Sequence, residues 1–332
     1  MKRREFLIAT AMLATATPQA MAQQHAKMKR VAMFHPAVKA VDMRIGGDPT
    51  YAIIFEEMKR LGYVEGVNMI VDRYSSEGRY DRYPEIVHEI VATRLDVILT
   101  MGPTSRVKLL QSETRTIPIV AWTGDPVTDG LVSSLARPGG NVTGLSFSAG
   151  TEFGAKRVQF LAEAVGKLTN IRRLGTPATD AIALSAEDAA KRMNIPLRNE
   201  FLQAPVNEAE YRRAFEAMQR DHVDGVVLSA ESENYTYRVL LGQLAQQYRL
   251  PAIGYYTDSV EAGALMSYGF DLKEGARRLA AQVVEILNGG NPAEMPFFQE
   301  THFELVINLK AAKELGLEIP AGLLVRADKV IE

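Results

Sequence analysis

Hydrophobic and polar residues alternate along this chain in two repeats, one typical of buried strands and one typical of amphipathic helices. Short runs rich in Val, Ile and Leu predict strands, and each is followed by a segment whose apolar residues stand three or four positions apart. In the first part of the chain this pattern predicts strands at 30–34, 67–71, 95–99 and 117–122, and helices at 51–61, 83–92 and 104–111.

The same alternation starts again after the turn-rich segment 137–141. It predicts helices at 153–165, 185–193, 208–219 and 235–248, and strands at 171–174, 197–201, 225–228 and 251–254. Strands that alternate with helices are typical of parallel sheets covered by helices. We therefore expect an α/β protein with two doubly wound lobes.

The remaining tail is too short for a third domain. Its pattern predicts a strand at 264–268, a long helix at 272–287 and a strand at 303–307. We expect these elements to return to both lobes and complete them.

The N-terminus predicts export. Arg3 and Arg4 precede a short apolar run, and small residues up to Ala22 form a cleavage site, so 1–22 is interpreted as a signal peptide. The paired arginines favour the twin-arginine route, with an ordinary secretory signal as the alternative. No other segment approaches the roughly 18 apolar residues of a membrane span, so we expect a soluble product in the periplasm.

Composition excludes several classes of function. The chain has no cysteine, which removes disulfides, thiolate metal sites and cysteine nucleophiles. Its formal charge of −2 argues against nucleic acid as a partner. The sequence lacks nucleophile-elbow, phosphate-loop, dinucleotide and zinc-protease motifs, and its 5 histidines show no ligand spacing. We therefore expect no cofactor and no metal.

Long motifs carry a resemblance to a known family. The chain resembles the tryptophan/tyrosine-type substrate-binding proteins of ABC importers over nearly its whole mature length, at 61–66, 77–85, 114–127, 130–146, 261–272 and 303–320. The resemblance implies a type I periplasmic binding protein fold, with a small-molecule ligand enclosed between two lobes that are joined by three crossovers. It also implies an ABC permease and an ATPase as partners of a monomeric receptor.

On this interpretation the two lobes are each made of two segments. We expect the first lobe to contain 29–142 and about 267–291, and the second to contain 143–266 and about 292–332.

Ligands of such sheets bind beyond the carboxyl ends of the strands, so the loops there supply the candidate site residues. Gly102, Thr104 and Ser105 follow the third predicted strand and open a helix, where amides and hydroxyls would hold a carboxylate. The alternative is an ordinary helix cap. The family commonly has Gly-Thr-Pro at this place, whereas this chain has Gly-Pro-Thr.

The next loop offers Trp122 and Asp125. Trp122 is the only tryptophan and would stack on an aromatic or cationic ligand, or else pack in the core. Asp125 precedes a proline, as a structural N-cap does, and its functional interpretation is a partner for an ammonium group.

In the second lobe, Thr176, Ser229 and Glu231 follow predicted strands in loops that we expect to set specificity. Glu231 in the cleft would favour a ligand with an amine, and the alternative is a solvated loop acid.

Further candidates lie near the predicted hinge and in the loop after the first strand. Tyr256 would pack the apolar part of a ligand, and Tyr268 and Asp271 lie near the hinge, where Asp271 alternatively caps a helix. Arg44 would pair with a carboxylate if it entered the cleft, and is otherwise solvated.

The sequence thus favours a receptor that closes on its ligand and performs no chemistry. Its ligand would be a small carboxylate, such as an aromatic or other amino acid or an organic acid. The alternatives are a ligand-sensing subunit for a membrane receptor and, less favoured, an exported hydrolase. A repressor-like regulator shares the fold, but an export signal and the lack of an N-terminal DNA-binding helix pair argue against it.

Overall fold

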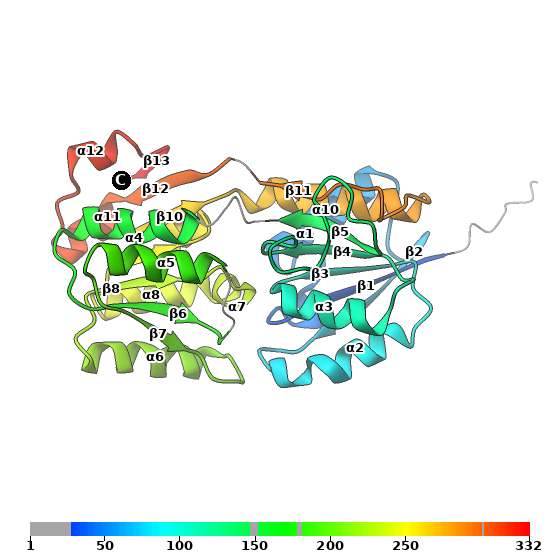
Figure 1. The fold of residues 1–332 in the computed structure, drawn as a ribbon, viewed down its shortest axis with the longest axis horizontal. Helices are drawn as coiled ribbons and strands as arrows, with labels where there is room; N and C mark the ends of the chain where they lie inside the picture. Colours follow the sequence, from blue (N-terminus) through cyan, green and yellow to red (C-terminus); the bar gives the residue numbers. More distant parts are fainter. Residues whose placement is uncertain (1–27, 147–151, 178–180, 301) are drawn as a thin grey trace, which may run out of the picture.

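Two α/β lobes lie side by side in the structure, a computed structural model that describes residues 28–332 except 147–151, 178–180 and 301. Each lobe is built around one sheet with helices on both faces (Figure 1). The predicted signal peptide at 1–22 lies outside the described residues.

The first lobe has a six-stranded parallel sheet in the order β11-β5-β4-β3-β1-β2. Its strands are β1 (Lys29–His35), β2 (Met69–Ser75), β3 (Val97–Met101), β4 (Ile119–Thr123), β5 (Val142–Ser146) and β11 (Phe298–Gln299). Because successive side chains of a strand point to opposite faces, Val31 and Met33 contact one hydrophobic core while Ala32 and Phe34 contact the other. One core contains α1 (Pro49–Arg60) and α10 (Leu272–Leu287), and the other contains α2 (Tyr83–Val91) and α3 (Thr104–Glu113).

The second lobe has a seven-stranded sheet in the order β13-β12-β10-β9-β8-β6-β7. Its strands are β6 (Ile171–Gly175), β7 (Leu197–Phe201), β8 (Gly225–Leu228), β9 (Ala252–Gly254), β10 (Met266–Gly269), β12 (Glu304–Asn308) and β13 (Lys329–Ile331). Its helices are α4 (Glu152–Val165), α5 (Ala181–Arg192), α6 (Glu208–Arg220), α7 (Ser232–Thr236), α8 (Arg238–Gln247), α9 (Asp258–Glu261), α11 (Leu309–Leu315) and α12 (Ala321–Leu324).

The α/β architecture with two lobes is confirmed, and the structure adds details that the pattern did not show. β12 runs antiparallel to β10, so this sheet is mixed. The helix predicted at 235–248 is two helices, α7 and α8, which meet at Tyr237. β5 was not predicted, because Gly144 interrupts its apolar run. A glycine within a strand often marks a close approach of another backbone segment. A Cβ at Gly144 would lie 1.8 Å from the Ala121 carbonyl oxygen of β4.

The chain passes between the two sheets three times, after β5, after β10 and after β11. Each passage comes a few residues later than the expected boundaries at 142, 266 and 291. The physical reason is strand pairing: β5 pairs with β4, β10 pairs with β9, and β11 pairs with β5, and a hydrophobic pattern does not specify these partners.

The two lobes touch each other directly across the cleft, at the edge away from the three crossovers (Figure 1). The backbone N–H of Val206, in the loop before α6, donates to the carbonyl oxygen of Gly78 in the first lobe at 3.0 Å. Tyr80 of the first lobe also packs against the core of the second. The lobes are therefore closed on one another in this structure.

Candidate functional site

A pocket of about 450 Å³ lies between the two lobes, and this volume includes solvent space at its mouth. The first lobe contributes residues at the carboxyl ends of its strands and the start of α1, and the second contributes α7 and the loops after β8 and β9. The lining residues are His35, Asp48, Thr50, Met101, Gly102, Trp122, Ala230, Ser232, Tyr235, Tyr256, Phe270 and Leu272.

Four aromatic side chains form the apolar part of this pocket. The ring centroids of Tyr235 and Tyr256 are 4.9 Å apart, and those of Trp122 and Phe270 are 5.7 Å apart. Trp122 is fixed from behind by α10, because a Cβ at Gly275 would lie 2.5 Å from the indole ring. Rings that are held in place in this way can pack on an aromatic or apolar ligand with little loss of side-chain entropy.

Among the described residues that line the pocket, Asp48 is the one with a carboxylate. It caps α1: its Oδ1 accepts hydrogen bonds from the backbone N–H groups of Thr50 at 2.9 Å and Tyr51 at 3.3 Å. Burial raises the pKa of Asp48, and the two backbone hydrogen bonds oppose that shift. The charge of Arg238 and the Thr50 side chain also oppose the shift, so the Asp48 carboxylate lies among groups that favour its charged form.

His35 presents a hydrogen-bond donor at the end of β1. Its Nδ1 accepts from the backbone N–H groups of Ala37 at 3.1 Å and Val38 at 2.8 Å, which places the proton of a neutral imidazole on Nε2. Burial, together with the nearby charge of Arg106, holds the pKa of His35 well below its usual value. His35 is therefore a neutral donor at neutral pH.

Three of the predicted site residues line the pocket, namely Gly102, Trp122 and Tyr256. The Tyr256 hydroxyl donates to the carbonyl oxygen of Ala230 at 2.6 Å, so this ring is anchored to the neighbouring loop.

Thr104 and Ser105 do not line the pocket. The hydroxyls of Thr104 and Thr123 share a hydrogen bond of 3.0 Å inside the first lobe, and Ser105 is exposed. The N-cap of α3 is Pro103, without a side-chain cap. The expected hydroxyl anchor for a carboxylate is therefore not formed here.

Asp125 and Asp271 have the structural roles that were kept as alternatives. Asp125 accepts from the backbone N–H groups of Val127 at 3.1 Å and Thr128 at 2.9 Å, and caps a turn. Asp271 accepts from the backbone N–H of Lys273 at 2.8 Å at the start of α10. Neither side chain lines the pocket.

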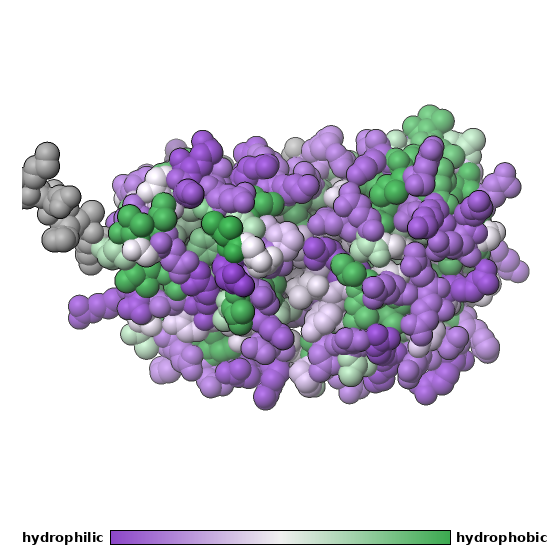
Figure 2. Space-filling view, turned by 180° about the vertical axis from the view of Figure 1, so that it is seen from behind, coloured by the Kyte–Doolittle hydropathy of each residue, from purple (hydrophilic) through white to green (hydrophobic). Residues whose placement is uncertain are grey.

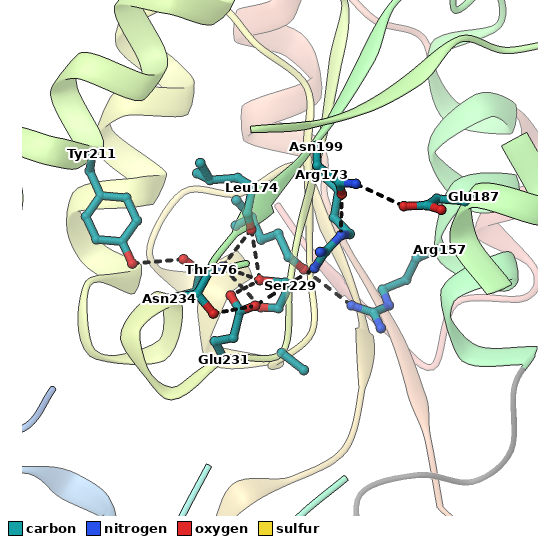
Figure 3. A network of polar contacts seen from close by, with 12 residues as sticks. Arg157, Arg173, Leu174, Thr176, Glu187, Asn199, Tyr211, Ser229, Glu231 and Asn234 are labelled. Atoms are coloured by element: carbon teal, nitrogen blue, oxygen red, sulfur yellow. Dashed lines mark hydrogen bonds and ion pairs between the residues drawn. The ribbon is translucent and has the colours of Figure 1, made fainter. Parts of the chain in front are cut away.

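Thr176, Ser229 and Glu231 lie together behind the pocket wall in a buried polar network (Figure 3). The Ser229 and Thr176 hydroxyls donate to the Glu231 carboxylate, and Arg173 forms an ion pair with Glu231 at 3.8 Å. Asn234 donates to the Ser229 hydroxyl at 2.9 Å. Burial raises the pKa of Glu231 to about 8, although Ser229 and Arg173 oppose the shift.

Tyr268 and Arg44 lie outside the pocket lining. Tyr268 stacks on Phe153 with a centroid distance of 5.1 Å and accepts from the Lys156 ammonium at 3.3 Å. Arg44 is exposed and donates to the carbonyl oxygen of Val41 at 2.8 Å, so it is a solvated loop residue in this structure.

Five lining residues with side chains important for the site were not predicted, namely His35, Asp48, Thr50, Tyr235 and Phe270. One signal was present: Asp48 precedes Pro49, which is typical of a helix N-terminus, and it follows the first strand at its carboxyl end.

Within the described residues, no cluster of three or more His, Asp or Glu side chains is arranged to hold a metal ion. No helix in that part of the chain has the length and apolar character that crossing a bilayer requires. The face seen in Figure 2 is mostly hydrophilic, with hydrophobic residues in separate groups.

Comparison with known proteins supports the fold and the type of site. The family model described as "ABC transporter substrate binding protein" matches residues 40–331. The chain is 23% identical over 258 residues to a tyrosine-binding protein of Clostridioides difficile, covering 77% of this chain and 73% of that protein.

Two solved structures share the fold. A conserved domain protein from Vibrio cholerae has a TM-score of 0.75 and 28% identity, with 92% of this chain and 100% of that chain covered. An ABC domain in complex with L-Trp from Streptococcus pneumoniae has a TM-score of 0.73 and 23% identity, with 91% and 99% covered. Solute-binding proteins for sugars and inositol also match, which confirms the type I periplasmic binding protein fold.

Proposed function

Because the chain belongs to the family of ABC transporter substrate-binding proteins, we propose that it captures an aromatic amino acid outside the cytoplasm for an ABC importer. The observation that carries this proposal is the pocket between the lobes, which combines an aromatic lining with one carboxylate. The tyrosine-binding relative and the structure with bound L-Trp support the same class of ligand.

Different lining residues contact different parts of a ligand of this class. Trp122, Tyr235, Tyr256 and Phe270 pack the aromatic side chain, since offset or edge contacts between rings are favourable. The Asp48 carboxylate takes the ammonium group, because a buried carboxylate is stabilised by an opposite charge within hydrogen-bond distance.

The protein captures its ligand by closure of the two lobes, and it performs no chemical reaction. A ligand between the lobes contacts both of them only when they are closed, so it binds the closed form more tightly and shifts the population toward it. The hydrogen bond between Val206 and Gly78 is a contact of the closed form that exists without help from the ligand. A permease with its ATPase then receives the closed, loaded receptor.

The proposed place of action is the periplasm, and the predicted signal peptide at 1–22 supports it. The receptor would work as a monomer, since each molecule contains both walls of its own pocket.

Isothermal titration of the mature protein, from Gln23 onward, tests the proposal. We expect binding of L-tyrosine, L-tryptophan or L-phenylalanine and no binding of sugars. Thermal unfolding gives a second measurement, because a ligand at 100 times its dissociation constant raises the free energy of unfolding by about 2.7 kcal/mol. Trp122→Ala and Asp48→Asn variants should lose affinity, whereas Asp125→Ala should not. Binding of a sugar alone, or no binding of any amino acid or aromatic acid, would refute the assignment.

A further inference from the structure

Arg106, on α3, is a buried cation without a hydrogen-bond partner. Its side chain is 1% exposed, and Nε, Nη1 and Nη2 have no acceptor among the described residues. Burying a charge without a partner is strongly unfavourable, so such groups are normally paired or bind a ligand. This guanidinium is therefore a candidate for binding an anion.

Two aromatic rings pack beside the guanidinium, with their centroids 5.7 Å apart and their planes at 88°. Its Cζ lies 4.9 Å from the ring centroid of Phe34 and 5.4 Å from that of Tyr83. Cation–π contacts of this kind hold the group in place without accepting a hydrogen bond in the guanidinium plane. The geometry suits a bidentate carboxylate, which binds along an N–H edge in that plane.

The guanidinium adjoins the floor of the pocket. A Cβ built on Gly102 would lie 2.3 Å from Nη2 of Arg106, so the group packs directly against a residue that lines the pocket. His35, another lining residue, is close enough for the Arg106 charge to lower its pKa. The Arg106 charge and His35 therefore lie near each other at this wall of the pocket.

The buried acid that faces this region comes from the opposite lobe. Glu233 of α7 is 3% exposed; burial raises its pKa, and the charge of Arg106 opposes that shift. Because Glu233 belongs to the second lobe, parting of the lobes removes this cover from Arg106. A ligand that enters the open cleft then has access to the guanidinium.

We infer that Arg106 binds the carboxylate of the ligand, with the Nε2–H of His35 as a second donor. This inference rests on the proposed function and names the group that holds the acid end. Arg106 replaces the hydroxyls of Thr104 and Ser105 in that role, and it complements Asp48 at the amine end. The two charges of a free amino acid are then matched by two opposite charges on the first lobe.

The test compares ligands with and without the carboxylate. Dissociation constants of L-tyrosine and tyramine, and of L-tryptophan and tryptamine, are measured by titration for the wild-type protein, Arg106→Gln and Glu233→Gln. Hydrogen bonds to a charged group are worth roughly 1.5–3 kcal/mol, so the wild type should bind the acids on the order of 10–150-fold more tightly than the amines. In Arg106→Gln this ratio should fall to the small remainder that the His35 donor supplies, while Glu233→Gln should keep it.

Arg172→Gln is the matched control for loss of a buried arginine. Arg172 is 4% exposed and pairs with Asp221 at 2.9 Å away from the pocket, so this variant should lose stability without changing the ratio. If Arg106→Gln does not fold, Arg106→Lys replaces it, and we expect a reduced ratio because a lysine cannot bind a carboxylate bidentately.

An unchanged ratio in the Arg106 variant overturns the inference. It is also overturned if Arg106→Gln and Glu233→Gln weaken acids and amines equally, because the pair then stabilises closure and does not bind the ligand. If the wild type binds neither acids nor amines, the proposed function itself fails, which is a distinguishable result.

Discussion

Substitution of Gly78 by alanine separates closure of the lobes from the stability of each lobe. Gly78 has φ of +78°, and a Cβ there would lie 2.3 Å from the carbonyl oxygen and 2.8 Å from the backbone nitrogen of Val206. Val206 belongs to the other lobe, so the clash exists only when the lobes are closed. The same movement that relieves the clash also lengthens the 3.0 Å hydrogen bond between the two residues.

Two energetic effects of Gly78→Ala add up. Positive φ costs alanine roughly 1–2 kcal/mol whether the lobes are open or closed. The clash across the cleft costs about 1–3 kcal/mol, the usual range for overpacking, and only in the closed state. The ligand binds the closed state, so the cost of the clash is subtracted from the free energy of binding. The dissociation constant should therefore rise roughly 5- to 150-fold.

Gly66→Ala is the matched control. Gly66 has φ of +79°, almost the same as Gly78, and no heavy atom lies within 4 Å of its Cβ position. Titration with the best amino-acid ligand should therefore show weaker binding for Gly78→Ala and wild-type binding for Gly66→Ala, with a similar loss of thermal stability in both unliganded proteins. Equal dissociation constants for the two variants would refute the reasoning that this contact belongs to the binding-competent state.

Three further predictions concern the site. The free energy of unfolding should fall as pH rises from about 4.5 to about 8, because Glu231 with its raised pKa binds a proton more tightly in the folded state. Glu231→Gln should flatten this slope in urea titrations, and an unaltered slope would contradict it. Trp122 is the only tryptophan, so ligand binding should change the intrinsic fluorescence, and Trp122→Ala should cost about 3–5 kcal/mol of stability. Asp48→Asn keeps the cap and should weaken binding of amines at least tenfold, whereas Asp271→Ala should lose about 1 kcal/mol of stability and no affinity.

The sequence predicts most of the helices and strands because their apolar repeats are regular. The amphipathic pattern of α1 and α10 and the apolar runs of β1, β3 and β4 each follow one clear period, and the structure has these elements within a few residues of their predicted positions. The pairing of strands was not predictable in this way. β11 and β13 have two and three residues, too few to show a period, and both are held by neighbours far away in the sequence.

The site was only partly predictable, for a related reason. Gly102 directly follows β3 and Trp122 lies near the end of β4, and a residue at the end of a parallel strand is placed by the sheet itself. The direction of a loop side chain depends on local hydrogen bonds. Asp125 accepts hydrogen bonds within its own turn, whereas Asp48 caps a helix whose N-terminus lines the pocket. Both have the sequence pattern of a cap before proline, and only tertiary structure distinguishes them.

The order in which the segments form each lobe also affects how the chain folds during its synthesis. The core of the first lobe includes Ala276, Leu279 and Val283 of α10, and its sheet ends with β11. A nascent chain that has left the ribosome only as far as β5 thus lacks one helical layer of its first lobe. Domains normally fold as units in N-terminal order, but here neither lobe is complete until the last strands of the chain are made. We therefore expect the chain to fold as a single unit, and we expect products of early termination to expose the face of the first sheet that α10 covers.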